Sequence, residues 1–117
     1  MKVLVIGSNS FSGSNLVNKL LDEGYDVIGI SRSAEYSDIF LPYKKNPRLR
    51  NFRFFNYNLN YDNNKIGALI KKERIKHIFN FAAQGEVRSS FYYPLNHYQI
   101  NCMSHINLLE KIKRFDF

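Results

Sequence analysis

The sequence predicts an α/β fold built on a doubly wound parallel sheet, with helices on both faces. Short apolar runs rich in β-branched residues alternate with longer segments whose apolar residues have helical spacing, which is the pattern of repeated βαβ units. The first apolar run, Val3 to Ile6, passes directly into a turn rich in glycine and serine, Gly7 to Gly13. A helical pattern follows, so a strand, a small-residue turn and a helix come in that order.

Two of the expected strands, the first and the second along the chain, are short and apolar enough to be buried on both faces of a parallel sheet. Four strands are expected in all. They cover Lys2 to Ile6, Asp26 to Ile30, Phe52 to Phe55 and His77 to Phe81. Between the second and third strands, the segment Ser31 to Asn51 has no regular pattern and contains two prolines. We expect a loop there with at most a short helical turn.

Three helices are expected from apolar residues spaced three and four positions apart. The first ends before Gly24, which stands where a helix-terminating glycine belongs, and its apolar face comprises Phe11, Leu16, Val17, Leu20 and Leu21. The second is short, with the apolar residues Ile66, Leu69 and Ile70. The third opens at Pro94, because proline fits a first helical turn, and it carries Ile100, Met103, Ile106, Leu109 and Ile112.

The composition argues against several classes of protein. The net charge is +7, but the basic residues lie in two separate runs, Lys44 to Arg50 and Lys71 to Lys76, without a base-reading motif. We favour solvated surface over a nucleic-acid interface for both runs. A single cysteine excludes an intrachain disulfide, and the three histidines lack metal-site spacing. The apolar run near the amino terminus is too short for a signal peptide or a membrane span. We therefore expect a cytoplasmic protein without membrane, nucleic-acid or metal partners.

The turn from Gly7 to Gly13 has the residues that a pyrophosphate-binding turn needs. Gly7 allows the backbone to turn tightly beside a phosphate, and Gly13 lets the helix pack closely on the strand. The free N–H groups and the dipole at the helix N-terminus attract phosphates, so Gly7, Ser10, Phe11 and Gly13 are the candidate pyrophosphate-binding residues. Ser10 takes a position where glycine is usual. A plain glycine–serine loop before a helix is the alternative interpretation.

These features together predict a Rossmann-type dinucleotide-binding domain. Such a sheet usually has about six strands, whereas four are expected here. We therefore interpret residues 1–117 as the amino-terminal part of an NAD(P)-binding domain with an incomplete sheet. An incomplete sheet leaves an open edge and an uncovered helix face, which favour self-association.

The end of the second strand bears on the choice of cofactor. Many dinucleotide-binding folds place a carboxylate there, which binds the ribose hydroxyls of adenosine. This chain has Ser31 and Arg32 instead. Because guanidinium pairs bidentately with phosphate, Arg32 favours NADP, which carries a 2′-phosphate, over NAD. The alternatives are an exposed Arg32 with no ligand role, and NAD as the cofactor.

Several short motifs follow one another along the chain: Ile6 to Leu16, Val27 to Arg32, Tyr57 to Leu59, Phe79 to Ser90 and Asn101 to Glu110. In this order they resemble the extended short-chain dehydrogenase/reductase family, in particular its nucleotide-sugar epimerases and its GDP-mannose or dTDP-glucose 4,6-dehydratases. The first motif is similar to the family turn T-G-G-x-G-F-I-G-S-H-L, with departures at the threonine, two glycines, the isoleucine and the histidine. The second resembles the strand end of NADP-using members. The resemblance covers the whole chain.

The resemblance implies further cofactor-binding residues. Asn58 and Leu59 stand where the family has G-D-[LI], whose aspartate holds the adenine amino group. They are therefore candidates for contact with adenine. The fourth strand ends in a motif similar to the family's L-A-A, and the residues expected to line the nicotinamide side are Ala82, Ala83 and Gln84.

The same resemblance implies residues around the substrate. Glu86 and Ser90 lie in the loop that meets the sugar nucleotide in the family. A solvated loop glutamate is the alternative interpretation of Glu86. Asn101 matches the first asparagine of the family helix N-x-x-G-T-x-N-L-L-E, which supports the active-site backbone. In that helix Ser104 and His105 replace the glycine and the threonine.

The resemblance finally implies a function for the complete protein. Members move a hydride from a nucleotide-sugar substrate to bound NAD(P)⁺, carry out an elimination or an inversion on the sugar, and return the hydride. They are lyases or isomerases. A homodimer is expected for the complete protein. The family's catalytic Ser/Thr and Tyr-x-x-x-Lys residues, and the substrate domain, are expected beyond Phe117, so this chain alone is expected to be inactive. A non-catalytic dinucleotide-binding or regulatory module is the alternative.

Overall fold

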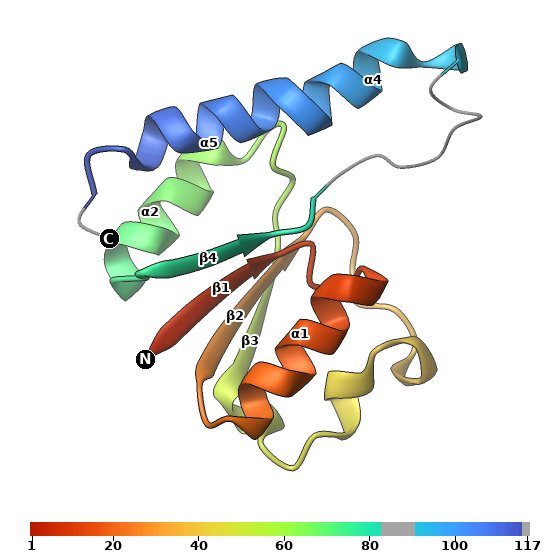
Figure 1. Cartoon of the computed structure of the whole chain (residues 1–117), viewed down its shortest axis with the longest axis vertical. Coiled ribbons are helices and arrows are strands. Elements are labelled where there is room, and N and C mark those ends of the chain that lie inside the picture. The colour runs from red at the N-terminus through yellow and green to blue at the C-terminus, as the bar shows by residue number, and fades with distance from the viewer. Residues whose placement is uncertain (83–90, 116–117) are drawn as a thin grey trace.

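The sheet has four parallel strands in the order β3-β2-β1-β4 within the residues that the computed structural model describes, 1–82 and 91–115 (Figure 1). The strands are β1 (Lys2–Ile6), β2 (Asp26–Ser31), β3 (Phe52–Asn56) and β4 (His77–Asn80). The expected doubly wound α/β class is confirmed. Three strand ends differ from the prediction by one residue: β2 and β3 are longer, and β4 ends before Phe81.

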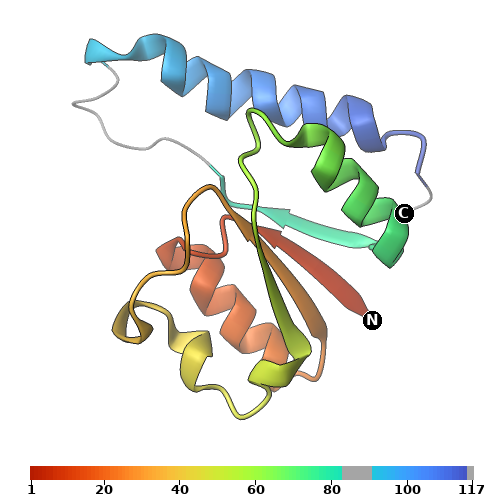
Figure 2. The same cartoon turned by 180° about the vertical axis from the view of Figure 1, so that it is seen from behind.

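The helices cover both faces of the sheet. On one face lies α1 (Phe11–Asp22), and on the other lie α2 (Asn63–Glu73) and α5 (Ser104–Ile112) (Figures 1 and 2). α5 continues a longer helix that begins with α4 (Pro94–Tyr98) and passes through a π-helical segment, Gln99–Met103. In the described part of the chain, none of these helices is long and apolar enough to cross a membrane.

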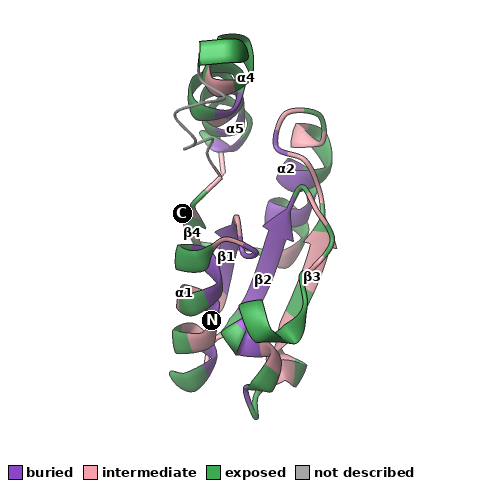
Figure 3. Cartoon of the chain, turned by 90° about the vertical axis from the view of Figure 1, so that its right-hand side faces the viewer, coloured by how far each residue is buried: buried purple, intermediate pink, exposed green. Residues whose placement is uncertain are grey.

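Two cores lie on either side of the sheet because successive strand residues point to opposite faces. In β1, Val3 and Val5 belong to the core under α1, whereas Leu4 and Ile6 belong to the core under α2 and α5. β1 and β2 are the most buried strands, as Figure 3 shows in purple. The near-continuous apolar runs of the central strands therefore serve both cores at once.

The expected loop between β2 and β3 instead contains three short 3-10 helices. They are Asp38–Phe40, Pro42–Lys45 and Leu49–Asn51. Leu41 and Tyr43 are fully buried in the core under α1. This segment therefore covers the sheet beside α1, although its sequence has no long helical pattern.

Phe11 does not lie on the buried face of α1, contrary to the prediction. It is the first helical residue, and it is 86% exposed. The buried residues of α1 are Gly13, Ser14, Val17 and Leu21. α1 ends as predicted, because Gly24 has a left-handed φ of 89° just beyond it.

The apolar residues of the third expected helix do not all lie on one buried face. Met103, Ile106 and Leu109 are exposed, whereas the residues that pack inward are Ile100, Ser104, Leu108 and Ile112. The inward residues are spaced by four and face α2, where Gly67 allows close approach to Lys111. The helix has apolar residues on two sides, and its packing against α2 selects one of them.

An ionic cluster joins the amino-terminal end of the sheet to α2. Glu73, whose side chain is 11% exposed, accepts bonds from Lys2 at 2.7 Å and from the guanidinium of Arg53 at 2.9 Å. The hydrogen bond from Arg53, and then that from Lys2, lowers the pKa of Glu73 from its ordinary 4.5 to about 2. The ionised carboxylate thus holds together the starts of β1 and β3 and the end of α2.

Glu73 should make the fold sensitive to acid. Its folded pKa is depressed, so its stabilisation is complete above pH 4.5 and is lost as the pH falls toward 2. We expect Glu73→Gln to lower the free energy of unfolding at neutral pH and to flatten its dependence on pH between these values. Denaturant titrations across that range measure both effects. The matched control is Glu110→Gln, which removes the carboxylate of an exposed pair with Lys113; an equal effect in both variants would contradict the assignment.

Candidate functional site

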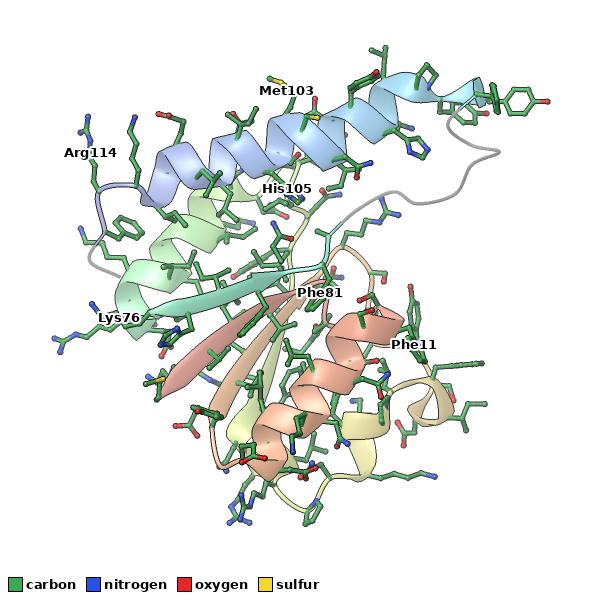
Figure 4. The ribbon with its side chains drawn as sticks, viewed as in Figure 1. Phe11, Lys76, Phe81, Met103, His105 and Arg114 are labelled. Atoms are coloured by element: carbon green, nitrogen blue, oxygen red, sulfur yellow. The ribbon has the colours of Figure 1, made fainter. Side chains whose placement is uncertain are left out.

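The candidate site lies where the order of the strands reverses. The chain moves from β1 outward to β2 and β3, and then returns to place β4 on the other side of β1. Ligands of open α/β sheets bind in the crevice beyond the carboxyl ends of the strands at this point. Gly7 follows β1, and Phe81 follows β4 (Figure 4). The Phe81 N–H donates to the carbonyl oxygen of Ile6 at 2.7 Å.

A cleft of about 190 Å³ occupies this position. Residues that follow all four strands line it, together with Ile100 from the long helix. The predicted site residues that it brings together are Gly7, Ser10, Arg32, Asn58, Leu59 and Ala82. Lining residues that sequence analysis did not single out include Asn9, Ser33, Tyr36, Tyr57 and Phe81.

Other predicted residues lie elsewhere. Phe11 and Gly13 are in the first turn of α1, beside the cleft but not among its lining residues. Asn101 lies in the π-helical segment Gln99–Met103, which interrupts the regular helix. Ala83, Gln84, Glu86 and Ser90 lie outside the described residues. In the described part of the chain, no three histidine, cysteine, aspartate or glutamate residues gather as metal ligands do.

The turn after β1 leaves no space for a side chain at either glycine. Gly7 has a φ of 85°, and a Cβ there would lie 2.9 Å from the carbonyl carbon of Phe81. A Cβ on Gly13 would lie 2.1 Å from the carbonyl oxygen of Gly7. Both positions therefore require glycine, and the start of α1 lies directly against the end of β1. This is the geometry that a pyrophosphate-binding turn requires.

Ser10 caps α1 instead of crowding the turn. Its Oγ accepts a hydrogen bond from the Gly13 N–H at 2.9 Å and donates to the carbonyl oxygen of Gly7 at 2.7 Å. Its φ of −71° is ordinary for any residue, so the serine is accommodated without strain. In the described part of the chain, the N–H groups of Phe11 and Ser12 have no acceptor. They are the first-turn donors available to an anion.

Asn9 ties the turn to the segment after β2. Its side-chain Nδ2 donates to the carbonyl oxygens of Ser33 at 3.1 Å and Ala34 at 2.9 Å. Its backbone N–H donates to the Oγ of Ser31 at 3.0 Å. Asn9 does not stand out in the sequence, because its partners are more than twenty positions away and only the parallel pairing of β1 and β2 brings them close.

The segment after β2 contains a cation, Arg32, that lines the cleft and a carboxylate, Glu35, that binds other residues of the chain. Arg32 is exposed and lines the cleft. Glu35 accepts hydrogen bonds from the Tyr43 hydroxyl at 2.5 Å and from Lys44 at 2.9 Å, so both of its oxygens are engaged. Burial, and then the bond to Glu35, raises the pKa of the Tyr43 phenol. Tyr43 therefore remains a neutral donor to Glu35.

The remaining lining residues have established contacts of their own. The Asn58 Oδ1 accepts a hydrogen bond from the Asn60 N–H at 2.8 Å, so one of its two acceptor positions is already used. Leu59 is 3% exposed and also belongs to the core under α2 and α5. The carbonyl oxygen of Ala82 lies 2.8 Å from Nε2 of His105, which reaches it from α5 (Figure 4).

Comparison with known proteins identifies the family. The family model described as GDP-mannose 4,6 dehydratase matches residues 4–117. The chain belongs to this family. Its membership confirms the resemblance of the motifs to nucleotide-sugar dehydratases and epimerases, and it agrees with the glycine turn and the switch-point cleft.

Two curated relatives match nearly the whole chain. The chain is 33% identical to Protein CapI of Staphylococcus aureus, over 99% of this chain and 35% of that protein. It is 30% identical to the GDP-mannose 4,6-dehydratase of Yersinia enterocolitica, over 96% of this chain and 31% of that protein. The chain therefore spans about a third of the length of these curated relatives.

A solved structure supports the fold. The UDP-glucose 4-epimerase of Thermus thermophilus, in complex with NAD, superposes with a TM-score of 0.78 at 28% identity. The match covers 97% of this chain and 34% of the epimerase. The Rossmann-type architecture predicted from the strand and helix pattern is thus confirmed.

The cap made by Ser10 can be tested by substitution. We expect Ser10→Ala to lower the free energy of unfolding by about 1 kcal/mol, because the Gly13 N–H loses its side-chain acceptor. Ser10→Gly should cost only a few tenths of a kcal/mol, since glycine is itself tolerated at an N-cap. Ser12→Ala, at an exposed neighbour, is the control for urea denaturation. Equal losses for Ser10→Ala and Ser12→Ala would show that the cap contributes nothing.

Proposed function

We propose that this chain forms the NAD(P)-binding part of a nucleotide-sugar 4,6-dehydratase or epimerase. The observation that carries the proposal is the turn from Gly7 to Gly13. Neither glycine has room for a side chain, and the turn lies at the switch point of a parallel sheet. Family membership and the relatives' names support nucleotide sugars as the substrate class. The Thermus thermophilus epimerase with bound NAD supports a nicotinamide cofactor.

The residues present fit a dinucleotide. The N–H groups of Phe11 and Ser12, at the positive end of the α1 dipole, would bind the pyrophosphate beside the tight turn that Gly7 allows. Arg32 would bind the adenosine ribose or its phosphate. Asn58 and Leu59 would contact the adenine, and the nicotinamide side would lie toward Ala82, Ala83 and Gln84.

When bound, the cofactor supplies the chemistry by accepting a hydride from the sugar and returning it. This chain's own residues would bind and orient that cofactor. Glu86 and Ser90 would meet the sugar nucleotide, and Asn101 would support the backbone of the active site from the long helix. We place the catalytic Ser/Thr and Tyr-x-x-x-Lys residues outside this chain, so we expect it to be inactive alone. The complete protein would be a lyase or an isomerase.

We further propose NADP as the preferred cofactor, with NAD as the alternative. Arg32 is an exposed residue that lines the cleft at the end of β2. Glu35, the nearby carboxylate, is held by Tyr43 and Lys44 on both oxygens. A 2′-phosphate would therefore meet a cation without facing a free carboxylate.

The role of Arg32 predicts a cofactor-selective loss. We expect Arg32→Ala to raise the Kd for NADP about 10- to 100-fold, the range for losing a charge-assisted hydrogen-bond pair. The Kd for NAD, which lacks the phosphate, should change little. Isothermal titration calorimetry of both cofactors measures the difference, and Arg50→Ala, at an exposed position outside the cleft, controls for net charge. Equal losses for NADP and NAD would refute the phosphate contact, and an unsubstituted chain that binds neither would refute the proposed function.

A homodimer through the long helix is a further part of the proposal. Met103, Ile106 and Leu109 are 49%, 53% and 63% exposed. Met103 points away from the sheet (Figure 4). Apolar side chains gathered on one side of a helix favour contact with another apolar surface. A second copy of the chain offers the same surface, as a two-fold interface requires.

This surface predicts concentration-dependent self-association. We expect Leu109→Lys to shift the chain toward monomer in sedimentation velocity experiments, because a charge at the contact would have to be desolvated. Ile39→Lys makes the same change at a residue that is 77% exposed and lies far from the helix in sequence. Monomeric behaviour of the unsubstituted chain at all concentrations would contradict the proposal.

A further inference from the structure

The geometry points to Tyr36 as the residue on which the adenine ring of the cofactor stacks. This inference rests on the proposed function and adds an aromatic contact to the adenine site. Tyr36 lines the cleft together with Arg32 and Leu59, and the residue is 52% exposed. An exposed aromatic ring at the rim of a ligand cleft offers a face on which a flat base can stack.

Tyr36 is the one described aromatic residue of the cleft that suits this role. Tyr57 also lines the cleft, but its ring stacks on Phe55 at a centroid distance of 5.6 Å, with Lys65 5.9 Å over the ring. Phe81 follows β4 beside Gly7, on the side assigned to nicotinamide. Tyr36 follows β2, on the side assigned to adenosine.

Covalent chemistry places the adenine near Tyr36. Arg32 would hold the ribose or its 2′-phosphate, and adenine is joined to that ribose by a single glycosidic bond. The base therefore lies within one ring's reach of the segment that contains both Arg32 and Tyr36. Leu59 lines the same cleft from the segment after β3, so an apolar side chain is available there as well.

Two sets of hydrogen bonds fix the segment that contains Tyr36. Asn9 binds the carbonyl oxygens of Ser33 and Ala34, and Glu35 is bound by the Tyr43 hydroxyl. Tyr43 is itself fully buried, with its ring 4.5 Å from that of Phe52. The backbone just before Tyr36 is thus fixed before any ligand arrives, which lowers the entropy lost when a base stacks on the ring.

The test compares ring and non-ring variants with two ligands. We expect Tyr36→Ala to raise the Kd for NADP and for adenosine 2′,5′-bisphosphate about 5- to 100-fold, and Tyr36→Phe to leave both within about twofold. Binding should also reduce the absorbance of the adenine band in the unsubstituted chain and in Tyr36→Phe, but not in Tyr36→Ala. The control Phe40→Ala removes a ring of the same segment that is 66% exposed and does not line the cleft, and it should behave as the unsubstituted chain does.

A second variant tests the fixed segment without touching the cleft. Tyr43→Phe keeps the ring against Phe52 and removes the hydroxyl that binds Glu35. We expect it to raise the Kd for adenosine 2′,5′-bisphosphate by at most about tenfold and to weaken the loss of adenine absorbance.

The outcomes separate this inference from the proposed function. If the unsubstituted chain binds NADP and Tyr36→Ala binds it equally well with the same loss of adenine absorbance, the stacking role is wrong and the proposed function stands. If Phe40→Ala weakens binding as much as Tyr36→Ala, the effect is one of loop structure and the stacking role is again wrong. If the unsubstituted chain binds no dinucleotide, the proposed function fails, and this inference fails with it.

Discussion

The close contact between the end of β1 and the start of α1 is the constraint on which the candidate site depends. The carbonyl oxygen of Gly7 occupies the space that a side chain on Gly13 would need. The helix N-terminus is therefore fixed at the carboxyl end of the central strand, and its first N–H groups are held at the switch point of the sheet. On the other side, the hydrogen bond from Phe81 to Ile6 holds the end of β4 against the same turn. These two contacts fix the part of the cleft wall that follows β1 and β4, which comprises Gly7, Ser10, Phe81 and Ala82.

The segment between β2 and β3 links the core to the cleft. Tyr43 closes the core under α1 with its ring and holds Glu35 with its hydroxyl. Glu35 precedes Tyr36, so burial on one face of the sheet fixes the backbone at the rim of the cleft. Fixing a loop in this way removes disorder that a ligand would otherwise have to remove on binding. The long helix, in contrast, is only partly covered. One side packs on α2, and another side leaves apolar residues exposed.

The glycine turn of the candidate site was predictable from the sequence because it depends on backbone geometry. Gly7 and Gly13 stand out in the sequence because only a few positions in a protein exclude every side chain. The strand before them and the helix after them identify the turn as a candidate pyrophosphate-binding motif. Ser10 was predicted to lie in this turn, but its role as the N-cap of α1 was not predicted. Asn9 and Tyr36 escaped notice because neither residue type is rare and their contacts join segments distant in the chain. Family membership then connects this site to enzymes of nucleotide sugars, of which the chain spans about a third.

The sequence by itself determined the order of strands and helices, because apolar periodicity and glycine positions are local properties. It determined that β1 serves two cores, since alternate residues of a buried strand must face opposite sides. Only the tertiary structure decided which side of the long helix is buried. Met103, Ile106 and Leu109 are as apolar as Ile100, Leu108 and Ile112, but only the second set meets α2. Periodicity shows that a helix has an apolar side; where two sides compete, the surface that arrives from elsewhere in the chain makes the choice.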